Sequence, residues 1–207
     1  MTKFDDIYEV AADNHGLITS SEARAIGVTN NELVQYARRG SLVRVGQGVY
    51  RLARHVPTEA DPYALAVALV GEGAFLYGEA VIALLGLAPT TPGRMRVATA
   101  RRVRRALPDY VEVVPVRDGA SVVRYEGVPC QRIDDAIRAE RGRVPGERLA
   151  AAAREGRAKG YITRKGFDRL IEALEARPCE GAEWQEEPGL RFSASMGSGT
   201  STCAHAR

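Results

Sequence analysis

Residues 4–52 constrain the fold most, because short helical patterns with glycine stops lead into a glycine-rich hairpin. FDDIYEVAADNHG places apolar residues at helical spacing, and LITSSEARAIGVT carries a short helix that Thr19 or Ser20 can cap. A third helix is expected from roughly Asn30 to Arg39, closed by Gly40. LVRV, GQG and VYRL then have the pattern of a β-hairpin. Three helices followed by a hairpin predict a winged helix-turn-helix.

The third helix has an apolar and a polar side. At about 100° per residue, Leu33, Val34 and Ala37 share one stripe, which we expect to pack on the first two helices. Asn and Gln side chains can bond adenine edges bidentately, Arg can do so to guanine, and a helix N-terminus can meet a phosphate. A solvated polar face is the alternative interpretation. The residues predicted to contact DNA from this helix are Asn30, Asn31, Gln35, Arg38 and Arg39.

Charge divides the same segment into two halves. Residues 1–29 hold two basic and five acidic residues, whereas residues 30–56 hold five arginines against Glu32 alone. This asymmetry suits one surface on DNA phosphates and another facing away from them. On the predicted wing, Arg44 and Arg51 would contact the DNA backbone or minor groove, and Gln47 would lie at the tip. Double-stranded DNA is therefore the predicted partner.

The remainder of the chain predicts an α+β fold. HVPTEADP, residues 55–62, has the composition of a linker, and YALAVALVG and GEAVIALLGL are expected to form a packed helical hairpin. RMRVATA, VEVVPV and SVVRYEGVPCQRI are valine-rich strand patterns, and three helices are expected after them, the last capped by Thr163. We predict a winged helix-turn-helix domain over residues 1–56, a mixed α+β domain over 57–176, and a disordered tail over 177–207.

A second basic cluster lies in RMRVATARRVRRALP. It is either an additional nucleic-acid contact or a surface for an acidic partner, and a solvated strand-and-loop edge explains it nearly as well. The chain has only three lysines, so most of its positive charge comes from arginine, whose planar fork suits phosphates and bases. The members of the cluster are Arg94, Arg96, Arg101, Arg102, Arg104 and Arg105.

Signatures of other functional classes are missing from the sequence. It contains no GxxxxGK[ST], HExxH or GxSxG motif, and Asp134 and Asp135 are adjacent and point about 100° apart on a predicted helix. The three cysteines are far apart in the sequence and form no CxxC pair. No apolar run approaches the length of a membrane span. We therefore expect no catalytic residue, metal, cofactor or membrane association, and a reducing cytoplasm as the location.

The order of these motifs resembles the AbiEi family of antitoxins from type IV toxin–antitoxin systems. The resemblance runs over about residues 4–175 and rests on three stretches. GLITSSEARAIGVTNNELVQYARRGSLVRVGQGVYRL is similar to the family's winged helix, and AFLYGEAVIALLGL to its helix ending in Gly-Leu. GVPCQRIDDAIRA is similar to a third family segment, with Arg132, Ile133 and Asp135 at the corresponding positions. The Thr that usually follows the arginine in the family is missing here.

The resemblance implies an antitoxin that represses its own operon through the N-terminal winged helix, on inverted repeats in its promoter. It also implies a second domain that counteracts a nucleotidyltransferase-type toxin without forming a stable complex with it. Two alternatives remain open at this point. One is a stand-alone winged-helix regulator whose second domain binds a ligand or partner, and the other is a nucleic-acid-processing enzyme anchored by the winged helix.

Overall fold

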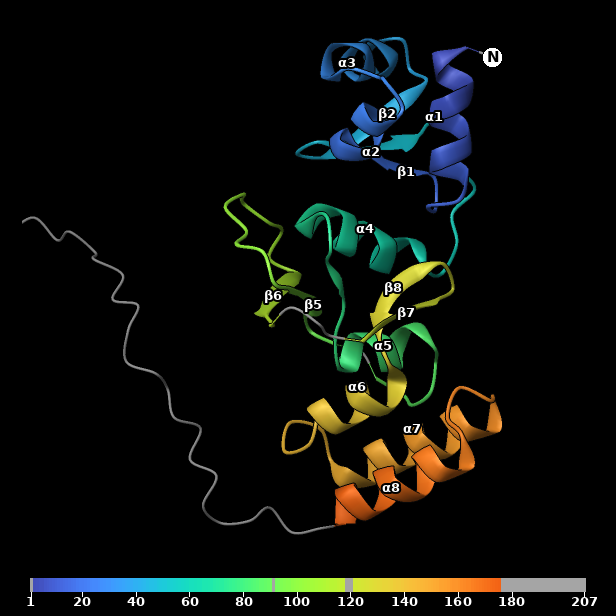
Figure 1. Ribbon diagram of the computed structural model, residues 1–207, viewed down its shortest axis with the longest axis vertical. Coiled ribbons are helices and arrows are strands. Elements are labelled where there is room, and N and C mark those ends of the chain that lie inside the picture. The colour runs from blue at the N-terminus through green and yellow to red at the C-terminus, as the bar shows by residue number, and fades with distance from the viewer. Residues whose placement is uncertain (1, 91, 118–120, 176–207) are drawn as a thin grey trace, which may run out of the picture. The chain divides into compact units, whose positions relative to one another are not determined.

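The computed structural model describes residues 2–90, 92–117 and 121–175 (Figure 1), and these residues belong to one compact unit. The predicted tail, residues 177–207, lies outside the described residues. The N-terminal part contains three helices and three strands, in the order and sheet topology of a winged helix. Its elements are α1 (Lys3–Ala12), β1 (Leu17–Thr19), α2 (Ser20–Ala25), α3 (Asn30–Arg38), β2 (Leu42–Gly46) and β3 (Val49–Leu52), and the sheet order is β1-β3-β2.

A capping box starts each of these three helices. Thr2, Thr19 and Thr29 each accept a hydrogen bond from the backbone N–H three residues later, and an acidic side chain at that position bonds back. The reciprocal bonds satisfy amide groups that have no partner within a helix. Thr19 is thus the cap of α2, one of the two predicted alternatives. The strand β1 was not expected from the sequence.

The core of the N-terminal part corrects one prediction about α3. Leu33 is fully buried, but Val34 is 37% exposed and does not pack inward. Tyr36 takes its place: its ring lies 5.2 Å from that of Phe4 on α1. Because Leu33, Tyr36 and Ala37 are spaced as i, i+3 and i+4, the packing stripe is rotated toward Tyr36 and Val34 is left on the outer face.

The second part is built on a five-stranded sheet in the order β6-β5-β4-β8-β7. β5 pairs in parallel with β6, β4 pairs in parallel with β8, and the other neighbouring pairs are antiparallel. The α+β fold class is confirmed. The elements are α4 (Asp61–Val70), β4 (Phe75–Leu76), α5 (Glu79–Leu84), β5 (Met95–Thr99), β6 (Val111–Pro115), β7 (Val122–Tyr125), β8 (Val128–Gln131), α6 (Ile133–Ala139), α7 (Gly146–Ala158) and α8 (Arg164–Glu175).

The expected helical hairpin over residues 63–87 does not form. Phe75 and Leu76, between the two helices, are both buried and form the central strand β4. Gly73 and Gly78 on either side have φ values of +76° and +57°, which allow the chain to enter and leave this short strand. The last two helices, α7 and α8, pack side by side (Figure 1), and Thr163 accepts a hydrogen bond from the Gly166 amide at the start of α8, as predicted for its cap.

A buried ion pair joins three elements of the second part. Glu140, which follows α6, is 1% exposed and forms an ion pair with Arg96 of β5. The same carboxylate accepts a hydrogen bond from the backbone N–H of Glu79 at 3.2 Å, at the start of α5. A Cβ atom at Gly78 would lie 1.8 Å from Glu140 Oε1, so only glycine leaves room for the carboxylate. Arg96 also lies over the ring of Tyr77, with its Cζ 5.1 Å from the centroid.

The three-stranded sheet shares a face with the second part. Leu17 and Val49 belong to the same buried cluster as residues of α4, and Val45 packs against that cluster. A Cβ atom at Gly46 would lie 2.2 Å from the Leu69 side chain of α4, which shows how closely that helix approaches the hairpin. Residues on both sides of residue 56 therefore contribute to one core.

Polar side chains tie the same junction together. The carboxylate of Asp61, at the start of α4, is buried and lies 2.7 Å from His55 Nε2. It also accepts a hydrogen bond from the Thr58 hydroxyl at 2.6 Å, and its other neighbour is His15 Nδ1 at 3.7 Å. Burial raises the Asp61 pKa, but these hydrogen bonds outweigh burial and the pKa is lowered overall. His15 Nε2 lies 2.8 Å from the backbone carbonyl of Glu126 in the β7–β8 turn.

Candidate nucleic-acid interface

The outer face of α3 carries amide and guanidinium groups at helical spacing. Asn31, Gln35 and Arg38 are exposed and follow one another at i, i+4 and i+7. Arg39 caps the helix, and its Nη2 lies 3.4 Å from Gln35 Oε1, so these two side chains lie together. The exposed Val34 adds an apolar group to this face, of the kind that can contact a thymine methyl group. The rotation of the helix thus brings Val34 into a surface where the sequence did not place it.

At the N-terminal end of α3, the acidic side chain is already occupied. Glu32 accepts hydrogen bonds from the Thr29 backbone N–H and hydroxyl at 2.8 and 2.9 Å, and from Lys3 Nζ at 2.7 Å. These bonds lower the Glu32 pKa to about 2, the largest contribution being that of Lys3. Asn30, the first residue of the helix, is exposed. The Lys3 ammonium pairs with this carboxylate, which reduces the repulsion of Glu32 toward a phosphate.

The wing is short. β3 begins at Val49, which pairs with both Thr19 of β1 and Gly46 of β2, so the hairpin hardly extends beyond the sheet. The backbone N–H of Ser20 donates a hydrogen bond of 2.8 Å to the Gly48 carbonyl, which holds the tip against the start of α2. Gln47 is exposed at this tip, next to Gly48 with a φ of +72°.

The structure does not bring Arg44 and Arg51 to one surface. Arg44 pairs with Tyr50 across the hairpin, whereas Arg51 pairs with Val43, so the two arginines point to opposite faces of the sheet. Arg44 is exposed, and its Nε lies 3.3 Å from the Gly46 carbonyl. Arg51 lies on the central strand, is partly buried, and its Nε has no hydrogen-bond partner among the described residues. Arg44 and Gln47 are therefore better placed than Arg51 to extend the surface of α3.

The second basic cluster is divided by the fold. Arg94 is exposed just before β5. Arg96 is only 14% exposed and forms an ion pair with Glu140, so it is not part of a surface patch. The other members are exposed in the segment between β5 and β6. Those members are Arg101, Arg102, Arg104 and Arg105.

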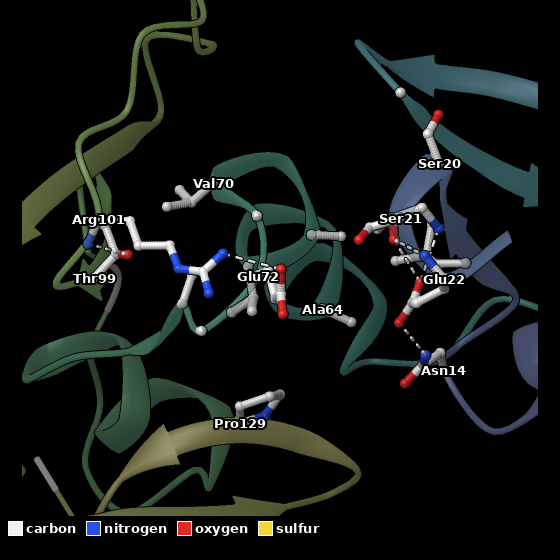
Figure 2. Close-up of a pocket in the computed structure, with 18 of the residues that line it drawn as sticks. Asn14, Ser20, Ser21, Glu22, Ala64, Val70, Glu72, Thr99, Arg101 and Pro129 are labelled. Carbon is white, nitrogen blue, oxygen red and sulfur yellow. Dashed lines mark hydrogen bonds and ion pairs between the residues drawn. The ribbon is translucent and has the colours of Figure 1, made fainter. Parts of the chain in front are cut away.

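These four arginines line a groove of about 1100 Å³, together with residues of α2, the wing tip and α4. Figure 2 shows Arg101 extending toward Glu72 on one side, with Ser20, Ser21 and Glu22 on the other. Arg24 of α2 and Arg124 of β7 also line it. No sequence pattern placed these two with the cluster, because they lie more than 15 residues away along the chain.

The described ranges hold neither a metal-ligating cluster nor a membrane-spanning helix. No group of three or more His, Cys, Asp or Glu side chains there could hold a metal ion. None of the helices in the same ranges is both long and apolar enough to cross a bilayer.

The fold and this surface define a class: an α+β protein that begins with a winged helix-turn-helix of the kind found in transcription regulators. Residues 5–53 match the family described as "Transcriptional regulator, AbiEi antitoxin". The resemblance to the AbiEi family is thereby confirmed for the winged-helix segment. No curated protein matches the chain. Among solved structures, the crystal structure of the RV2827C protein from Mycobacterium tuberculosis is similar at 16% identity and a TM-score of 0.41, covering 82% of this chain and 76% of that chain.

Proposed function

We propose that this protein is a cytoplasmic DNA-binding antitoxin that represses its own operon. In this proposal α3 and the wing bind inverted repeats in the promoter. The remainder of the chain counteracts a nucleotidyltransferase-type toxin, without a stable complex between the two proteins. The family of residues 5–53 supports the roles of transcriptional regulator and antitoxin in general, and the identity of the toxin class rests on the wider sequence resemblance.

The observation that carries the DNA-binding part is the outer face of α3. Its exposed Asn31, Gln35 and Arg38 offer the amide and guanidinium groups that read base edges in a major groove. The acidic residue of α3, Glu32, is paired with Lys3. A face with base-reading donors on a helix whose own acid is paired is suited to a polyanion.

A mobility-shift titration tests the role of α3. Gln35→Ala and Arg39→Ala should each weaken binding to the protein's own promoter by roughly 5- to 150-fold, which corresponds to about 1–3 kcal/mol for one base contact. Arg169→Ala is a matched control, because Arg169 is also exposed on a helix but lies on α8. Both α3 variants should melt at the temperature of the wild type. Wild-type affinity in both of them would contradict the assignment of α3 to the DNA.

Co-expression tests the antitoxin part. Growth arrest caused by an adjacent nucleotidyltransferase reading frame should be relieved by the full chain, and the two proteins should elute separately in size-exclusion chromatography. Relief should persist in Gln35→Ala, because α3 is assigned to the DNA and not to the toxin. Arrest that continues in the presence of the folded wild-type chain would contradict the antitoxin role.

A second candidate is a stand-alone regulator whose second part binds a ligand or partner. It is favoured by one observation: the groove of about 1100 Å³ adjoins the wing tip, where an occupant could alter DNA binding. Absence of a nucleotidyltransferase gene beside this one would favour it over the antitoxin.

A further inference from the structure

We propose that the second part of the chain binds the same DNA duplex as α3, through phosphate contacts in the arginine groove. This groove is defined by Arg24, Arg101, Arg102, Arg104, Arg105 and Arg124. The inference rests on the proposed function, because it assumes that α3 lies on DNA. It adds a second, sequence-independent contact, and five of its six arginines lie outside the winged helix.

The positive charge of the groove is only partly compensated, because two acidic residues, Glu22 and Glu72, line it beside the six arginines. Within the described ranges, Arg101 alone among the six has a carboxylate partner, Glu72 at 2.9 Å. Arg102 and Arg104 are exposed. Three others donate to backbone carbonyls, which orient a guanidinium without cancelling its charge. These bonds are Arg24 to Ser20 at 3.1 Å, Arg105 to Gln47 at 3.3 Å, and Arg124 to Gly127 at 2.7 Å.

The groove is continuous with the predicted DNA-binding surface. One of its walls is α2, which packs directly on α3. In a helix-turn-helix, the helix before the recognition helix crosses the DNA backbone, so a backbone that follows α2 passes the mouth of this groove. The Arg105 bond to the Gln47 carbonyl and the Ser20 bond to the Gly48 carbonyl join the arginine segment, the wing tip and α2.

The lining favours a phosphate backbone over a small ligand. Its positive groups come from exposed side chains, and the wall from α4 consists of small and branched apolar side chains such as Ala64, Val67 and Ala68. Specific recognition of a small ligand needs convergent polar groups inside a cavity. A row of exposed arginines fits the repeated charges of a duplex, which it would bind irrespective of base sequence.

The test measures salt dependence on two duplexes of equal length, the promoter and a scrambled sequence. The full chain is compared with the double variant Arg102→Ala/Arg104→Ala and with the control Arg164→Ala/Arg169→Ala on α8. Two lost phosphate contacts should reduce the slope of log K against log salt by about 1.8, and should weaken binding by roughly 10- to 100-fold at 0.1 M salt. Both duplexes should be affected alike, and the control should keep the wild-type slope.

An unchanged slope in the double variant, with the wild-type melting temperature, would overturn the proposal. A second result would also overturn it: ATP binding at micromolar concentration that is lost in the Arg102→Ala/Arg104→Ala variant, while the salt slope of DNA binding stays unchanged. The groove would then hold a free nucleotide. Failure of the proposed function looks different. In that case the wild type would bind promoter and scrambled duplexes equally and Gln35→Ala would change neither, while the effect of the arginine variant on the slope would still show whether phosphates enter the groove.

Discussion

Replacing Glu140 with alanine should destabilise the protein more than any comparable change to a surface acid. The Glu140 carboxylate is almost fully buried, forms an ion pair with Arg96 and accepts the Glu79 amide. The Arg96 side chain is itself only 14% exposed. The alanine variant therefore leaves the guanidinium group without its closest carboxylate, in a place that water hardly reaches.

The expected loss of unfolding free energy is about 3–5 kcal/mol, the usual cost of removing one partner from a buried pair. Leaving the Glu79 amide without an acceptor acts in the same direction, at about 1–3 kcal/mol if no water replaces the carboxylate. The total free energy of unfolding of a domain is about 5–15 kcal/mol, so the variant should be close to unfolding. Glu112→Ala is the matched control: Glu112 is 39% exposed, lies 3.9 Å from Arg96 Nε, and should contribute about 1 kcal/mol or less.

Urea denaturation followed by circular dichroism measures both variants against the wild type. A loss below about 1 kcal/mol for Glu140→Ala would refute the argument, because it would mean that Arg96 is not paired or is readily solvated. The double variant Arg96→Met/Glu140→Leu provides a second check. Since it removes both charges and keeps the volume filled, it should recover most of the stability lost by Glu140→Ala.

Two further predictions concern titratable groups. The Glu32 pKa is lowered from 4.5 to about 2, so its bond with Lys3 should stabilise the native state fully above pH 4.5 and be lost as the pH falls toward 2. An NMR titration of the Glu32 carboxyl should show this low midpoint, which Lys3→Met should raise; a wild-type midpoint near 4.5 would contradict the pairing. Burial raises the pKa of the Cys130 thiol to about 12, so iodoacetamide at pH 8 should label Cys130 only after unfolding. Peptide mass spectrometry would detect labelling of the native protein, and labelling at the rate of an exposed cysteine would show that the thiol is not enclosed.

The sequence predicted the helices of the N-terminal part well because their limits depend on neighbouring residues. Thr29 and Glu32 start α3 through bonds three residues apart, and Gly40, with a φ of +76°, follows its end. The rotation of α3 could not be predicted in this way. Val34 lies outward because Tyr36 packs on Phe4, a residue more than 30 positions away.

Very short strands and clusters of residues that are distant in the sequence also could not be predicted. β1 has three residues and β4 has two, too few for any alternation to distinguish them from a loop or a helix. In the sequence, Arg96 cannot be distinguished from the other arginines of the basic cluster. It differs from them in the fold because the buried Glu140 pairs with it. The groove, likewise, exists because α2, the wing tip and the β5–β6 segment meet in space.

The shared face between the hairpin and α4 has a consequence for how this chain can evolve. Leu17 and Val49 are part of the core that includes α4, and Gly46 gives the Leu69 side chain room to approach. A winged helix transplanted from another protein would have to bring a glycine and a matching apolar face at these positions, or α4 would have to change with it. We therefore expect substitutions at Gly46 and Leu69 to be inherited as a pair, and DNA specificity to diverge through the outer residues of α3 while this face stays constant.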